Sequence, residues 1–140
     1  MSIADLKART QQIVDTFNTH DPVATAAFFA PTAELRDVGL ARPALGPAQI
    51  AAAYAGYLAA IPDAHIHIDR LVAEGNTVVA EWTSSGTHRG ALLGIPATGK
   101  PICFRGVSIF KYRAGLVIAK TQIWDLAGVL RQLGLLPEQE

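Results

Sequence analysis

The chain has 140 residues, half of them apolar, and its 12 Lys and Arg residues balance 12 Asp and Glu residues. Such a length and apolar content exclude a disordered chain and predict one packed domain over residues 1–140. The even charge, without a strongly basic stretch, argues against nucleic acid or an anionic membrane surface as the partner, and no stretch approaches the roughly 20 apolar residues of a membrane span.

The N-terminal segment has the apolar spacing of helices. Apolar residues three and four positions apart predict a helix over 3–17, and Ser2 together with Asp5 gives it a capping-box start. Asp21-Pro22 suits the start of a second, short helix over 22–29, because aspartate caps helices and proline fits their first position.

A strand and a third helix are predicted next. The strand is expected at 32–37, and prolines and a glycine then mark a loop at 43–47. From Pro47 an apolar stripe continues to about residue 60, and Pro62 ends the predicted helix.

Beyond residue 64 the apolar period changes from helical to alternating. This change predicts strands over 65–73, 77–88, 101–112 and 116–124, turns at 74–76 and 113–115, a loop at 90–99 and a last helix over 126–133. Helices followed by a meander of long strands are typical of an α+β fold, here with helices packed on a curved antiparallel sheet. We expect these layers to enclose an apolar pocket for a small organic molecule.

The last strand carries a candidate catalytic base. One face of it is predicted to hold Val117, Ala119, Thr121, Ile123 and Asp125. The small side chains before Asp125 leave room beside it, and partial desolvation suits a carboxylate to removing a proton near neutral pH. Asp125 also directly precedes the helix over 126–133, where it would serve as the N-cap. Both roles stay open, and they compete for the same carboxylate oxygens.

His88 is a second candidate. It ends its strand on the same predicted face as Trp82 and Ser84. A lone histidine at such a place is more often a surface or satisfied residue than a functional one. Its functional interpretation is a donor to a developing enolate oxygen, or a partner that positions the substrate.

One strand also carries a pattern with metal-ligand spacing. His65, His67 and Asp69 alternate and therefore point the same way, which could ligate a metal. The opposite face, with Ile66 and Ile68, makes the better core face. We therefore expect the polar trio on a solvated face and predict no metal site.

The single cysteine, Cys103, has no sequence-placed histidine partner and is expected to be an inert thiol. It cannot form an internal disulfide. A reducing compartment is therefore favoured, by default the cytoplasm.

Five segments in the C-terminal half together carry a family resemblance. They are Pro62-Asp63, Ala73–Asn76, Gly86–Lys100, Arg105–Gly115 and Trp124–Leu136. They closely resemble the SnoaL-like polyketide cyclase or ester cyclase family, within the nuclear-transport-factor-two-like superfamily. The resemblance is strong from about residue 60 to 136 and looser before it.

This resemblance implies a cone-shaped α+β barrel, shared with ketosteroid isomerases and limonene epoxide hydrolases, and a homo-oligomer, either a dimer or a tetramer. It also implies chemistry without a cofactor on a hydrophobic, polyketide-like carbonyl compound. In the polyketide cyclases, an aspartate at the position matching Asp125 removes a proton flanked by carbonyls, and the enolate then closes a ring. The pocket supplies substrate folding and exclusion of water.

Under the cyclase or isomerase hypothesis, the catalytic residues are Asp125, the base implied by the resemblance, and His88. The residues expected to contact the substrate are Trp82, Arg105, Tyr54, Tyr57 and Trp124. One departure stands out, because family members commonly carry glutamate, histidine and tryptophan where this chain has Ala119, Lys120 and Thr121, and a lysine where it has Leu116.

Two other functions compete with the cyclase or isomerase hypothesis. Epoxide hydrolysis of the limonene-epoxide type needs two aspartates and an arginine around one water, for which Asp125, Arg105 and Asp37 are the only set available. A non-catalytic module would bind a lipid-like ligand in the pocket or use a sheet face for assembly. Arg105 and Lys111 lie at alternate positions of one strand and therefore face the same way. Their side chains point either to an outer interface or into the pocket.

Overall fold

A computed structural model describes residues 1–138 and confirms the predicted α+β class. The elements are α1 Ile3–Phe17, α2 Pro22–Ala26, β1 Phe29–Asp37, β2 Ala44–Leu45, α3 Gly46–Ala60, β3 His65–Glu74, β4 Thr77–Thr87, β5 Pro101–Arg113, β6 Leu116–Trp124 and α4 Leu126–Gln132. No helix among these residues is long and apolar enough to cross a membrane.

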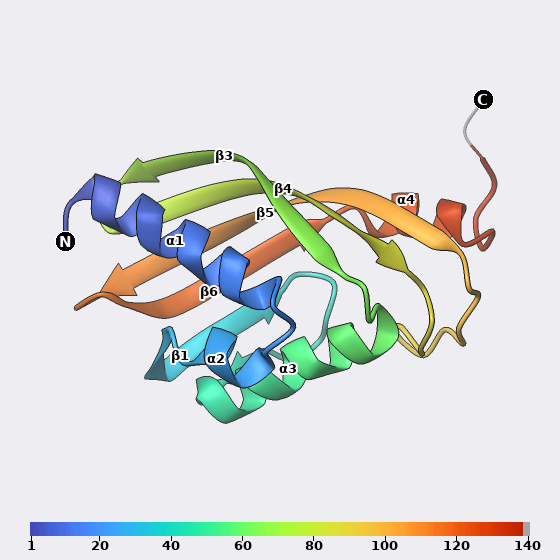
Figure 1. The fold of residues 1–140 in the computed structure, drawn as a ribbon, viewed down its shortest axis with the longest axis horizontal. Coiled ribbons are helices and arrows are strands. Elements are labelled where there is room, and N and C mark those ends of the chain that lie inside the picture. The colour runs from blue at the N-terminus through green and yellow to red at the C-terminus, as the bar shows by residue number, and fades with distance from the viewer. Residues whose placement is uncertain (139–140) are drawn as a thin grey trace.

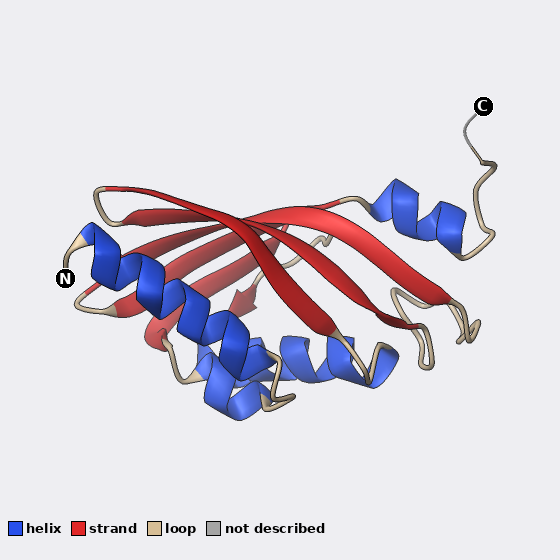
Figure 2. Cartoon of the chain, turned by 45° about the horizontal axis from the view of Figure 1, so that its top comes forward, coloured by secondary structure: helices blue, strands red, loops and turns tan. Residues whose placement is uncertain are grey.

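The strands form one curved sheet in the order β2-β1-β6-β5-β4-β3, which does not close on itself (Figure 1). Neighbouring strands are antiparallel as predicted, except that β1 and β6 run parallel. Figure 2 shows α1, α2 and α3 on one side of this sheet, whereas α4 lies beyond its far end. The side covered by α1–α3 is called the inner face below, and the opposite side the outer face.

The predicted helix starts are confirmed. Ser2 and Asp5 form the capping box of α1, and the side chain of Asp21 caps α2, with Pro22 in its first turn. The second helix is shorter than predicted, because the chain turns after Ala26 and enters β1 at Phe29. The two-residue strand β2 was not predicted, since it is too short to show any periodicity.

The side-chain parity predicted for the last strand is wrong over most of its length, because β6 contains a β-bulge. Lys111 of β5 pairs with Ala119, but the next residue, Tyr112, pairs with Val117, so Ile118 is an extra residue. One inserted residue moves every later side chain to the opposite face. Val117, which precedes the bulge, is buried, whereas Lys120 takes the inward position after it and Ile123 is 48 % exposed.

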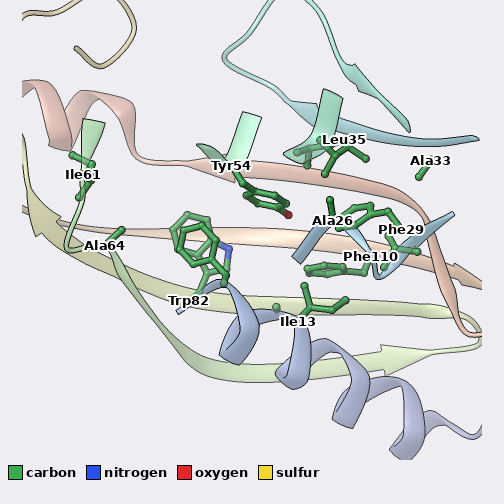
Figure 3. Packing of buried hydrophobic residues seen from close by; sticks show 14 of the residues in the cluster. Ile13, Ala26, Phe29, Ala33, Leu35, Tyr54, Ile61, Ala64, Trp82 and Phe110 are labelled. Atoms are coloured by element: carbon green, nitrogen blue, oxygen red, sulfur yellow. The ribbon is translucent and has the colours of Figure 1, made fainter. Parts of the chain in front are cut away.

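The core lies between the inner face and the helices. Alternate residues of β4 and β5 are buried, including Trp82, Phe104 and Phe110, and α1 contributes Ile13. Trp82 meets Phe104 edge-on, with ring centroids 5.8 Å apart. Figure 3 shows Trp82, Phe110 and Tyr54 of α3 projecting into the space between the layers. Burial of each such side chain contributes roughly 1.5–3 kcal/mol.

Candidate functional site

A cavity of about 720 Å³ lies between α3 and the inner face of the sheet. Its helix side includes Tyr54 and Tyr57 together with the small, exposed residues Ala52, Ala53 and Gly56 of α3. The sheet side of its wall consists of Leu35, Asp37, Ile66, Ala80, Trp82, Ser84, Phe104, Ser108, Phe110, Lys120, Gln122 and Trp124. A predominantly apolar wall with a few polar groups is typical of a small-molecule site.

Asp37 supplies a carboxylate to this wall. It ends β1 and is partly buried, and two neighbours on β6 hold its Oδ2: Gln122 Nε2 donates at 3.0 Å and Trp124 Nε1 at 2.8 Å. The backbone N–H of Gly39 donates to Oδ1 at 3.0 Å. An ionised carboxylate has about four lone-pair sites, so these three bonds orient the group and leave one site on Oδ1.

Lys120 supplies a cation to the same wall. Its side chain is buried, with only 9 % of the residue exposed, and Nζ donates to the Tyr54 hydroxyl at 3.1 Å. The ammonium also lies 5.0 Å from the centroid of Phe110 and 5.3 Å from that of Tyr54, which is the distance range of cation–π contacts.

Two further pairs of polar side chains in the wall are hydrogen-bonded to each other. Trp82 Nε1 donates to Ser108 Oγ at 2.9 Å, and the Tyr57 hydroxyl lies 3.1 Å from Ser84 Oγ. Burial raises the pKa of Tyr57, and the hydrogen bond with Ser84 only partly offsets this. Tyr57 is therefore a neutral hydroxyl at physiological pH and is suited to hydrogen bonding.

Four of the residues predicted to contact a substrate lie in the cavity wall, namely Trp82, Tyr54, Tyr57 and Trp124. The fifth, Arg105, does not, since β5 turns it to the outer face, where it is exposed. Lys111 faces the same way and is also exposed, so both side chains lie on the outer face.

Asp125 lies at the N-terminus of α4 and does not line the cavity. Its Oδ1 accepts the backbone N–H of Gly128 at 2.9 Å, which is the N-cap interaction. A side chain at position 128 would come within 2.1 Å of Asp125 Oδ2, so glycine lets the carboxylate fold back over the helix. Of the trio considered for epoxide hydrolysis, only Asp37 faces the cavity.

His88 is completely buried but also lies outside the cavity wall. Its Nδ1 accepts the backbone N–H of Thr98 at 3.3 Å, and its own backbone bonds to Gly99 and Lys100. His88 thereby joins the two ends of the loop after β4. Its contact with a substrate stays a prediction.

The polar trio of β3 lies on the outer face. His65, His67 and Asp69 are all exposed, and His67 Nδ1 lies 3.0 Å from Asp69 Oδ1. Thr83 Oγ1 donates to Asp69 Oδ2 at 2.7 Å, and this bond, followed by the one from His67, lowers the pKa of Asp69.

Sequence reasoning gave little weight to the two charged groups of the cavity. Asp37 entered only as part of the epoxide hydrolase set, although it continues the apolar parity of Ala33 and Leu35 along β1. For Lys120, the sequence shows only a departure from the family pattern. The bulge that turns Lys120 inward is visible only in the strand pairing, where the nine residues of β6 lie opposite eight of β5, Gly106–Arg113.

Comparison with known proteins agrees with this architecture. A family profile described as SnoaL-like polyketide cyclase matches residues 7–133. The chain belongs to this family. None of the curated proteins compared is similar enough to count as a match.

Solved structures support the assignment. TsrD from Streptomyces laurentii is 28% identical, with a TM-score of 0.84 over 97% of this chain and 99% of that chain. A candidate polyketide cyclase from Acidithiobacillus ferrooxidans is 27% identical, with a TM-score of 0.80 over 96% of this chain and 98% of that one. A Catenulispora acidiphila protein of ketosteroid isomerase-like fold, 21% identical, covers 91% of this chain and 93% of that one with a TM-score of 0.80, and shows the shared fold alone.

Proposed function

We propose that this SnoaL-like protein is a cofactor-free cyclase or isomerase that acts on a hydrophobic, polyketide-like carbonyl compound, with Asp37 as its general base. The observation that carries the proposal is the position of Asp37, a carboxylate in the wall of a largely apolar cavity. Asp125, the base expected from the family resemblance, caps α4 outside that wall. Family membership supports the cyclase class of reaction.

The hydrogen bonds around Asp37 hold its carboxylate in one orientation. Gln122 and Trp124 fix Oδ2, so the free lone-pair site of Oδ1 has a defined direction. Oδ1 would take a proton from a carbon beside a carbonyl, and the electron pair of that C–H bond would pass into the enolate. The enolate carbon would then bond to a second carbonyl carbon of the same molecule, and the resulting alkoxide would take the proton back from Asp37.

The aromatic part of the wall supplies substrate folding. Trp82, Phe104 and Trp124 form a contiguous set, with centroids of Phe104 and Trp124 5.2 Å apart. Planar conjugated substrates pack well on such surfaces. A substrate bound against this apolar wall would displace water from it, which would protect the enolate from being quenched before the ring closes.

The experiment measures proton exchange at a carbon acid. 2-Tetralone, a bicyclic ketone with an acidic benzylic C–H beside its carbonyl, is incubated with the protein in D₂O, and NMR follows deuterium uptake. We expect the wild-type protein to exceed the buffer rate. Asp37→Asn should lose roughly 10²- to 10⁴-fold of that acceleration, because general-base catalysis typically contributes this much.

The matched control is Asp125→Asn, with both variants checked for folding by thermal unfolding. Asp125→Asn should keep the wild-type exchange rate, since asparagine also caps helices. Loss of exchange in Asp125→Asn but not in Asp37→Asn would transfer the role of base to Asp125. No acceleration by the wild-type protein would contradict the proposal as a whole.

A further inference from the structure

Lys120 has an unusual environment for a lysine. It follows the bulge of β6, which turns it inward, and it lies against the rings of Tyr54 and Phe110 in the cavity wall. Only 9 % of the residue is exposed. Lysines are mostly exposed in folded proteins and are almost never fully buried unless they are paired.

No anionic partner for Lys120 occurs among the described residues. The ion pairs found within residues 1–138 join other side chains, all of them at the surface. The carboxylate of the cavity wall, Asp37, is held by Gln122, Trp124 and Gly39 rather than by Lys120. A buried ammonium whose hydrogen-bond partner is neutral has a strong preference for an added anion.

Tyr54 completes the arrangement. An ammonium can only donate hydrogen bonds, so Tyr54 Oη accepts from Lys120 Nζ at 3.1 Å and keeps its own O–H hydrogen. Within residues 1–138 that hydroxyl makes no other hydrogen bond. Two donors, one of them charged, therefore lie side by side in the cavity wall with donor capacity left over.

We infer that Lys120 and Tyr54 form an oxyanion site, and that the natural ligand of the cavity is an apolar compound with an anionic oxygen. This inference rests on the proposed function and names the substrate class for the same cavity. The anionic oxygen has two possible sources: a carboxylate that the substrate carries from the start, or the enolate oxygen that forms when Asp37 removes a proton. Charge-assisted hydrogen bonds to either oxygen are shorter and stronger than neutral ones.

The test uses two probes of the same shape, the anion 2-naphthoate and the neutral amide 2-naphthamide. Their dissociation constants are measured by titration calorimetry, or by the fluorescence of Trp82 and Trp124, which line the cavity. We expect the wild-type protein to bind 2-naphthoate more tightly. Lys120→Met should weaken 2-naphthoate roughly 10- to 100-fold and leave 2-naphthamide unchanged, because a hydrogen bond to a charged group is lost.

Two variants serve as controls. Arg42 also lines the cavity but is exposed, so Arg42→Gln should change the affinity for 2-naphthoate less than about 3-fold, as for a solvent-screened charge. Tyr54→Phe keeps the ring and removes the hydroxyl, and it should weaken 2-naphthoate by roughly 3- to 10-fold. This variant provides an independent test if Lys120→Met does not fold.

A third probe separates the two sources of the anion. 2-Naphthol ionises to a phenolate that resembles an enolate, and its absorption reports the ionised form. A preference for 2-naphthoate over 2-naphthamide indicates a substrate carboxylate. Binding of 2-naphthol as its phenolate at neutral pH, without that preference, indicates the enolate oxygen.

Equal affinity for 2-naphthoate and 2-naphthamide, together with 2-naphthol bound as the neutral phenol, would overturn the inference. The deuterium exchange of 2-tetralone would then still decide the role of Asp37 by itself. An affinity for 2-naphthoate that depends on Arg42 and not on Lys120 would overturn it as well, because the anion would then bind at the rim of the cavity.

Discussion

The two faces of the sheet use the same strands for different purposes. On the inner face, Trp82 pairs its N–H with Ser108, and Lys120 donates to Tyr54, so charged and polar groups meet neutral partners in an apolar enclosure. On the outer face, Asp69 pairs with His67 and Thr83 within reach of water. Electrostatic interactions are far stronger on the inner face, because the local dielectric is lower there. Chemistry is therefore expected from the few polar groups of the inner face rather than from the more numerous ones outside.

The largest expected difference between the faces is in packing. Phe110 is 1 % exposed on the inner face, and Phe110→Ala should lower the free energy of unfolding by about 3–5 kcal/mol. Ile123, 48 % exposed on the outer face, is the control, and Ile123→Ala should cost no more than about 0.5 kcal/mol. Urea unfolding measures both. Similar losses for the two variants would show that the parity of β6 after its bulge is not the one described here.

An intermediate effect is expected where the sheet ends. Asp125→Ala removes the bond from the Gly128 N–H and should lower the free energy of unfolding by about 1 kcal/mol, the usual cost of a lost helix cap. Asp125→Ser should restore most of the loss, because serine is also a strong N-cap. Thermal unfolding of the two variants checks this. An Asp125→Ala protein as stable as wild type would show that the cap contributes nothing.

The smallest effect is expected on the outer face. Arg105 is exposed, and the lowered pKa of Asp69 comes first from Thr83 and His67, with Arg105 contributing less. Arg105→Ala should therefore change the free energy of unfolding by no more than about 0.5 kcal/mol and leave 2-naphthamide binding unaltered. A marked loss of ligand affinity would place Arg105 in the binding site after all.

Local signals in the sequence predict most of the fold. The Ser2–Asp5 capping box, the Asp21-Pro22 start and the turn at 74–76 each act over a few residues, and the structure confirms all three. The parallel pairing of β1 with β6 joins segments about 85 residues apart in the chain, as in the bond between Asp37 and Gln122. No local pattern encodes such a pairing, so the predicted sheet was wholly antiparallel.

The site was harder to predict than the fold, for a physical reason. Successive side chains of a strand point to opposite faces, so the extra residue Ile118 reverses the direction expected for every later side chain of β6. Trp124, one of the predicted substrate contacts, does line the cavity. Lys120 and Gln122 were missed, because an uninterrupted alternation puts them on the outer face. The inward direction of Asp37 was predictable, because Asp37 continues the alternation of Ala33 and Leu35 and β1 has no bulge from Glu34 to Asp37.

The most direct test of the account is a crystal structure of the protein with 2-naphthoate bound. We expect the naphthalene rings to lie between α3 and the aromatic wall of Trp82 and Phe104, with the carboxylate within hydrogen-bond distance of Lys120 Nζ and Tyr54 Oη. A ligand bound on the outer face near Arg105, or beside Asp125 at the start of α4, would contradict the claim that the inner face carries the function.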